Sequence, residues 1–174
     1  YTLHTLFPYT TLFRSGELVD KYEALVMPNG WEISPEVSAI HGITHDYAVI
    51  NGIDEREAVG RFGLMHKRAS LRVAHNVSFD DRILRIGIKR FFSDAAAERY
   101  KATPAFCTAM TAKPIMKMPP TAKMMKTNFR NSFKTPNLAE ALEYFTGKTL
   151  TNAHRALPDT QACADIYFAM KKLE

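Results

Sequence analysis

Hydrophobic positions recur every three or four residues in several segments of the chain, and this spacing predicts helices. The clearest stripe follows Pro158, a residue that suits the first turn of a helix. Its members are Ala162, Cys163, Ile166, Met170 and Leu173. Helical spacing and capping residues predict four more helices: after Ser34 toward Ile40 with a stop at Gly42, from Asp54 to Arg68, after the cap candidate Ser78 to Phe92, and from Asn137 to Gly147.

Two other segments have the composition of strands. The first is Glu17 to Met27, which ends in the turn sequence Pro28-Asn29-Gly30, and the second is the short run Leu71 to His75. Prolines interrupt the pattern between Tyr100 and Pro136, so long helices are not expected there. Strands that alternate with helices favour an α/β architecture over a helical bundle or a β-sandwich.

Composition narrows the class of protein. The chain has 174 residues, 46% of them hydrophobic and 24% charged, which predicts one globular domain rather than a disordered or collagen-like chain. Two cysteines, Cys107 and Cys163, lack metal-ligand spacing and are too few for a disulfide scaffold, which favours a reducing, cytoplasmic location. No segment approaches the roughly 20 apolar residues of a membrane-spanning helix, so no membrane partner is expected.

The net charge of +5 is unevenly distributed. Residues 99–139 contain eight lysines and arginines and no acidic residue, so the rest of the chain sums to −3. On charge alone, this stretch suits either a solvated basic loop or a surface that faces a polyanion such as nucleic acid.

Two short clusters carry the residue types of a catalytic site. His-Asn-Val-Ser-Phe-Asp at 75–80 places a carboxylate in the first turn of a predicted helix, and His-Arg-Ala-Leu-Pro-Asp at 154–159 does the same. Alone, the first suits plain helix capping and the second a surface histidine. Together they suit a shared site for hard divalent cations such as Mg²⁺, with a neutral histidine that accepts a proton from an attacking water.

These clusters also carry a family resemblance. The run Val-Ser-Ala-Ile-His-Gly-Ile-Thr at 37–44, the cluster at 75–80 and the cluster at 154–159 resemble, in order and spacing, the DEDDh 3′-to-5′ exonucleases of the DNA polymerase III epsilon type. The resemblance covers roughly Gly16 to the C-terminus. It implies a ribonuclease-H-like fold with a central mixed sheet flanked by helices. It also implies two Mg²⁺ or Mn²⁺ ions and release of nucleoside monophosphates from a single-stranded 3′ end.

The resemblance assigns roles residue by residue. Asp80 and Asp159 match metal ligands, and His154 matches the general base. Three further residues match the pocket of the terminal nucleotide: Asn76, Phe79 and, less closely, His41. The neighbouring acids Asp81 and Asp165 match no ligand position and are interpreted as a helix cap and a solvated surface residue.

The family's first motif is missing from the chain. That motif is Asp-x-Glu on the first strand and supplies two of four metal carboxylates, but no Asp or Glu precedes Glu17. Thr5 to Ser15 instead resembles, residue for residue, the conceptual translation of a short-read sequencing adapter. We therefore expect residues 1–15 to be an artefact with no selected fold, the alternative being a genuine apolar strand-turn-strand. We also expect residues 16–174 to be an exonuclease domain without its first strand, and activity to be negligible.

Other interpretations remain open at this level. The chain could be a non-catalytic module that binds single-stranded nucleic acid through its basic stretch. The methionines between Met116 and Met125 suit either contact with a polymerase subunit or simple gap filling. The sequence does not separate a DNA from an RNA substrate.

Overall fold

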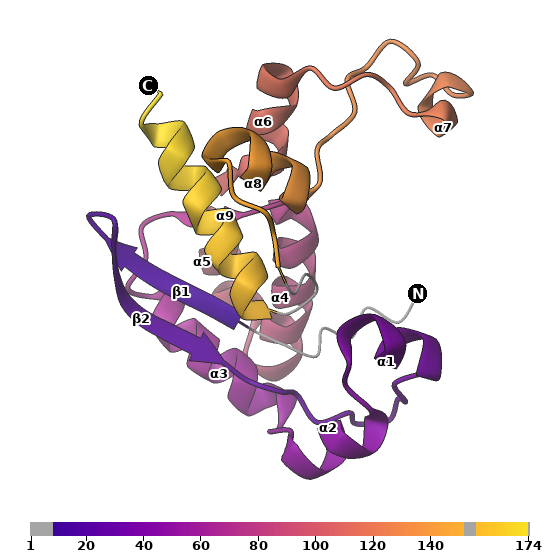
Figure 1. Cartoon of the computed structure of the whole chain (residues 1–174). Helices are drawn as coiled ribbons and strands as arrows, with labels where there is room; N and C mark the ends of the chain where they lie inside the picture. The colour runs from indigo at the N-terminus through magenta and orange to yellow at the C-terminus, as the bar shows by residue number, and fades with distance from the viewer. Residues whose placement is uncertain (1–8, 152–155, 174) are drawn as a thin grey trace.

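A computed structural model describes residues 9–151 and 156–173. Strands and helices alternate along the chain, as the sequence predicts (Figure 1). In chain order the elements are β1 (Tyr9–Arg14), β2 (Glu17–Glu23), α1 (Pro35–His41), α2 (His45–Asn51), α3 (Glu55–His66), β3 (Arg72–Ala74), α4 (Val77–Phe91), α5 (Asp94–Ala102), β4 (Ala105–Cys107), α6 (Thr108–Met116), α7 (Ala122–Met125), α8 (Leu138–Thr146) and α9 (Ala156–Lys171). None of the helices within these ranges has both the length and the apolar character to cross a bilayer.

The strands form two separate two-stranded sheets. β1 and β2 are antiparallel and are joined by Ser15 and Gly16, which both have positive φ, 51° and 87°. β3 and β4 are parallel, with Val73 opposite Phe106, and an isolated parallel bridge joins Val26 to Ile53. No backbone ladder of the described residues connects the two sheets. The mixed strand directions of the predicted α/β fold are therefore present, but they are divided between two sheets, and β1 occupies the segment where the sequence predicts a missing first strand.

Helix α9 joins the two sheets through side chains. It packs on both β1 and β3, and Figure 1 shows it alongside the β1–β2 hairpin. A row of aromatic rings continues this contact: Phe13 of β1 lies 5.2 Å from Phe168, Phe168 lies 5.3 Å from Tyr167, and Tyr167 lies 5.1 Å from Phe106 of β4. Edge-to-face ring contacts of this kind add stability beyond their buried area. The position of α9 therefore depends on packing with both sheets.

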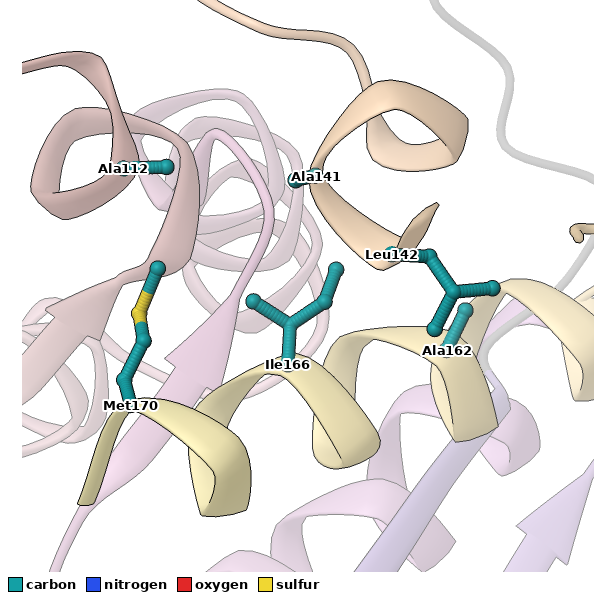
Figure 2. Packing of buried hydrophobic residues seen from close by; sticks show 6 residues of the cluster. All are labelled: Ala112, Ala141, Leu142, Ala162, Ile166 and Met170. Carbon is teal, nitrogen blue, oxygen red and sulfur yellow. The ribbon is translucent and has the colours of Figure 1, made fainter. Parts of the chain in front are cut away.

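The largest hydrophobic cluster lies where α6, α8 and α9 meet. Ile166 is completely buried at its centre and faces small residues on the neighbouring helices, as Figure 2 shows. The cluster comprises Ala112, Ala141, Leu142, Ala162, Ile166 and Met170. Four of the five stripe residues predicted after Pro158 are buried, but Leu173 is 73% exposed because α9 ends at Lys171.

Capping residues set the limits of several helices as predicted. Ser34 accepts a hydrogen bond from the N–H of Val37 at the start of α1, and Gly42 ends that helix with a φ of 76°. At α8, Asn137 and Glu140 form a reciprocal capping box. These capping residues lie within a few positions of the helix ends, so the sequence alone predicts where these helices begin and end.

Two sequence predictions about local structure are wrong. Tyr9–Arg14 forms a strand, with a register shift between Leu12 and Phe13, although the sequence predicts that the first strand is missing. Aromatic and β-branched residues there extend readily, and a two-residue turn returns the chain to β2. Ser78 does not cap α4: the cap residue is Asn76, and Ser78 already lies inside the helix. The interrupted stretch between Tyr100 and Pro136 holds only short helices, as predicted.

Candidate functional site

The first site carboxylate is placed by a tight junction between β3 and α4. Asn76 adopts a left-handed conformation, with φ 74° and ψ 52°, that asparagine tolerates better than most residues. Its side-chain oxygen accepts a hydrogen bond of 3.2 Å from the hydroxyl of Ser78. The chain then enters α4 at Val77, which places Asp80 in the first turn, where the helix dipole favours a negative charge.

The ring of His75 links this junction, through two hydrogen bonds, to two distant parts of the chain. Its Nε2 lies 3.1 Å from the carbonyl oxygen of Pro136 and its Nδ1 lies 2.9 Å from Oγ1 of Thr108. A carbonyl only accepts, so Nε2 carries the proton and Nδ1 accepts from the threonine hydroxyl. Burial lowers the pKa of His75, which keeps the ring neutral in this role. The motif that carries Asp80 is thereby fixed to α6 and to the start of α8.

Thr108 brings the second site helix to the same place. It is completely buried, and its hydroxyl lies 3.8 Å from the sulfur of Cys163 on α9. Burial raises the pKa of Cys163 to about 11, and the charge of Asp80 adds to that shift. Asp159 is one helical turn before Cys163 and on the same side of α9. Thr108 thus contacts both the junction that precedes α4 and the helix α9.

The two carboxylates lie in a partly enclosed setting. Asp80 is exposed, yet desolvation by the surrounding protein raises its pKa to about 6, and the charge of Asp81 adds to the increase. Asp159 is half-buried in the first turn of α9. A nearby cation would favour the ionised form of both groups. Carboxylate oxygens of this kind are the ligands that Mg²⁺ and Mn²⁺ prefer.

The metal-ligand set is nevertheless incomplete in the described part of the chain. No group of three or more His, Cys, Asp or Glu side chains there is arranged to hold a metal ion. Two carboxylates can contribute to a cation site, but they do not fit a site for two ions without further ligands.

The sequence predicts that Asp81 is a helix cap, but the structure shows that Asp81 joins α4 to neighbouring elements. It is no helix cap: its carboxylate pairs with Arg72 of β3 and accepts a 2.9 Å hydrogen bond from the hydroxyl of Tyr100. Arg72 also donates to the carbonyl of Thr103 at 2.8 Å and lies over the Tyr100 ring at 4.4 Å. These contacts tie α4 to β3 and α5, so they orient the helix turn that carries Asp80.

The remaining candidate residues differ in how far the structure places them. Phe79, next to Asp80 in the sequence, is 37% exposed. His41 ends α1 and accepts a 3.1 Å hydrogen bond from the N–H of Ile43, and no hydrogen bond in the described ranges joins it to α4 or α9. His154 lies outside the described residues. Asp165 is held by Lys148 at 2.7 Å, so it is paired rather than merely solvated.

Sequence reasoning misses the residue that organises the site. Thr108 links the α4 junction to α9, but a single threonine after a short strand gives no signal of that role. The three-residue strands β3 and β4 are also too short for a clear alternating pattern. Only the parallel pairing of these strands, which are distant in sequence, places Thr108 beside His75.

Comparison with known proteins defines the family. The RNase_T exonuclease family matches residues 13–167, a range that contains both carboxylate motifs. The chain belongs to this exonuclease family. Within it, the motifs identify the 3′-to-5′ exonuclease group that the sequence resembles.

Two relatives and two solved structures support this placement. The chain is 31% identical over 164 residues to the PolC-type DNA polymerase III of Thermotoga petrophila, and 30% identical over the same length to that of Thermotoga maritima. Each alignment covers 92% of this chain but only 10% of the relative. The chain therefore spans about a tenth of the length of these curated relatives.

The solved structures are those of exonuclease I. One is a product-bound structure, with a TM-score of 0.68 at 18% identity, covering 94% of this chain and 38% of the other. A second is Escherichia coli exonuclease I in complex with a dT13 oligonucleotide, with a TM-score of 0.67 at 20% identity, covering 95% and 36%. At these identities the likeness establishes the fold, which confirms the predicted α/β, ribonuclease-H-like class.

Proposed function

We propose that this chain is a 3′-to-5′ exonuclease domain of the kind that serves DNA polymerase III, acting on single-stranded 3′ ends of DNA and releasing nucleoside monophosphates. The observation that carries the proposal is the junction at Thr108, where the Asp80 turn and α9, which bears Asp159, meet. The names of the PolC-type relatives support a replication context, and the oligonucleotide in the exonuclease I complex supports a single-stranded substrate.

The proposed roles follow from chemistry and position. Asp80 and Asp159 would hold a divalent cation, Mg²⁺ or Mn²⁺, which supplies charge stabilisation at the phosphate. His154, close before α9 in sequence, would accept the proton of the attacking water. Asn76 and Phe79 flank Asp80 in the α4 motif and would contact the terminal nucleotide, and His41 is proposed for the same pocket with only its motif as support.

The present chain is proposed to be a poor catalyst. No Asp or Glu precedes Glu17, and the described residues offer no third metal ligand beside the carboxylate pair. Fixed charges at the reacting phosphate are the main source of rate in hydrolysis of this kind. A site with half the family's carboxylates should therefore hold its cations weakly and release almost no mononucleotide.

The test compares the chain with a repaired version. Purified chain is assayed for mononucleotide release from a single-stranded oligonucleotide with Mn²⁺, beside a chimaera in which residues 1–15 are replaced by a strand that carries Asp-x-Glu. We expect release only from the chimaera, abolished by EDTA and by His154→Ala. Robust EDTA-sensitive release from the unmodified chain would refute the loss of function.

The same chimaera tests the polymerase context. A proofreading domain is expected to remove a mispaired 3′ terminus of a primer faster than a paired one, because the mispaired end is already partly single-stranded. Asp159→Asn should abolish both reactions. Equal rates on the two termini would argue against proofreading, and an absence of release from the chimaera would argue against the exonuclease proposal itself.

A further inference from the structure

A basic arm leaves the body of the domain between α6 and α8. We define the arm as residues 118–134, because the N–H of Lys134 donates to the carbonyl of Met118 at 3.0 Å and closes its base. The arm projects outward and carries α7 near its tip (Figure 1). None of its residues is buried, so the hydrophobic clusters of the domain do not depend on it.

The arm is held by its own turns despite this exposure. The hydroxyl of Thr121 caps α7 by accepting from the N–H of Met124 at 3.2 Å. Thr127 then donates to the carbonyl of Met124 at 2.9 Å and accepts from the N–H of Phe129 at 3.2 Å. These bonds give the exposed side chains of the arm a defined arrangement, which lowers the entropy cost of binding a ligand.

The charges of the arm favour an anionic partner. Lys123, Lys126 and Arg130 lie on the arm and Lys117 immediately precedes it, and none of the four makes an ion pair with a described residue, whereas Lys134 pairs with Glu140. No acidic residue occurs anywhere in 100–139. A chain of phosphates can neutralise such a cluster with release of its counterions.

Exposed apolar side chains lie among these cations. Phe129 is 63% exposed and Phe133 is 43% exposed. The arm also has an open hollow of about 440 Å³, lined by Met125, Lys126, Thr127, Asn128, Arg130 and Asn131. Cations and amide donors beside exposed aromatic rings are typical of surfaces that bind single-stranded nucleic acid, where bases stack on the rings and phosphates meet the charges.

The end of the arm is linked to the segment that precedes the proposed site. Pro136, two residues after the arm, accepts the hydrogen bond from His75, which directly precedes the motif that carries Asp80. The C-terminal end of the arm is therefore joined, through Pro136 and His75, to the chain segment that carries Asp80.

From these observations we infer that the arm binds the single strand of DNA on the 5′ side of the terminal nucleotide, through Lys126, Arg130 and the rings of Phe129 and Phe133. This inference rests on the proposed function for the polarity of the strand. It adds a binding surface outside the carboxylate site, so nucleotides that are not being cleaved contribute to affinity.

The test is a binding titration of the full chain in EDTA, so that cleavage does not interfere. Fluorescence anisotropy of a labelled dT oligonucleotide is recorded for wild type, K126Q/R130Q, F129A/F133A and a control, R56Q/K67Q. The control removes one Lys and one Arg that lie on or next to α3, away from the arm, and that make no ion pair with a described residue. Circular dichroism spectra show whether each variant is folded.

The expected results are specific to the arm. F129A/F133A should weaken binding at least about fivefold, since each stacked base contributes roughly 1–3 kcal/mol. K126Q/R130Q should reduce the slope of log affinity against log salt by about 1.4, because each phosphate contact on a single strand contributes about 0.7. The control should bind as wild type does.

Failure of this inference is separable from failure of the proposed function. Folded arm variants that bind like wild type would overturn the inference, even if the chimaera releases mononucleotides. Loss of binding in the arm variants together with an inactive chimaera would leave the arm as a single-strand binding surface and refute the exonuclease proposal. If the wild-type chain fails to bind the oligonucleotide at low salt, the inference is also overturned, and a protein partner becomes the occupant to test.

Discussion

Replacement of Ile166 should weaken the whole domain, because this side chain fills the centre of the α6–α8–α9 cluster. Ile166 is completely buried and its neighbours Ala112, Ala141 and Ala162 are too small to fill a space left beside them. Ile→Ala in a core costs about 2–5 kcal/mol of unfolding free energy, and poor relaxation of the surroundings places a site near the upper end. We expect Ile166→Ala to cost about 3–5 kcal/mol and Ile166→Val about 1 kcal/mol.

Urea unfolding followed by circular dichroism measures this loss directly, with Leu173→Ala as the matched control. Leu173 lies just beyond α9 and is 73% exposed, so its truncation should change the unfolding free energy by less than about 0.5 kcal/mol. Domains of this size are commonly stable by only about 5–15 kcal/mol, so a split sheet leaves little margin for Ile166→Ala. Losses of equal size in Ile166→Ala and Leu173→Ala would refute the packing argument.

Two further predictions concern polar contacts around the site. Tyr100→Phe removes the hydroxyl that donates to Asp81 and should lower the unfolding free energy by about 1–2 kcal/mol in urea titrations, while an unchanged value would show that this bond adds nothing. His75 has a lowered pKa in the folded state, so below about pH 6.5 the unfolded chain binds more protons and stability falls. Asp80, whose pKa is raised to about 6, has the opposite effect on stability as the pH falls. The difference in unfolding free energy between wild type and His75→Gln isolates the contribution of His75. This difference should shrink from pH 8 to pH 5. A difference that is independent of pH would contradict a neutral, half-buried His75.

Local signals explain the parts of the fold that the sequence predicts correctly. The capping box of α8 and the glycine stop of α1 involve residues within a few positions of each other, so the printed sequence contains the whole interaction. The helix α2 is missed although Thr44 caps it, because seven residues carry only one buried position, Ala48, and so no stripe.

Parts that depend on distant contacts are the ones that the sequence does not predict. The strand β4 has three residues and exists through its pairing with β3, which lies about thirty positions earlier. Asp81 resembles a cap by position, but its partners Arg72 and Tyr100 come from two other elements. For the candidate site, the motifs predict the two carboxylates, whereas the contacts of Thr108 with His75 and Cys163, which link the α4 junction to α9, appear only in three dimensions.

The measurement closest to the central claim is a titration with Mn²⁺, followed by electron paramagnetic resonance of the free ion. It compares wild type, Asp80→Asn, Asp159→Asn and the control Asp46→Asn, whose carboxylate also lies in the first turn of a helix but in α2. If Asp80 and Asp159 share one cation, each of their variants loses the same bound ion, and the control retains it. Binding of Mn²⁺ that survives either substitution at Asp80 or Asp159 would contradict a common site.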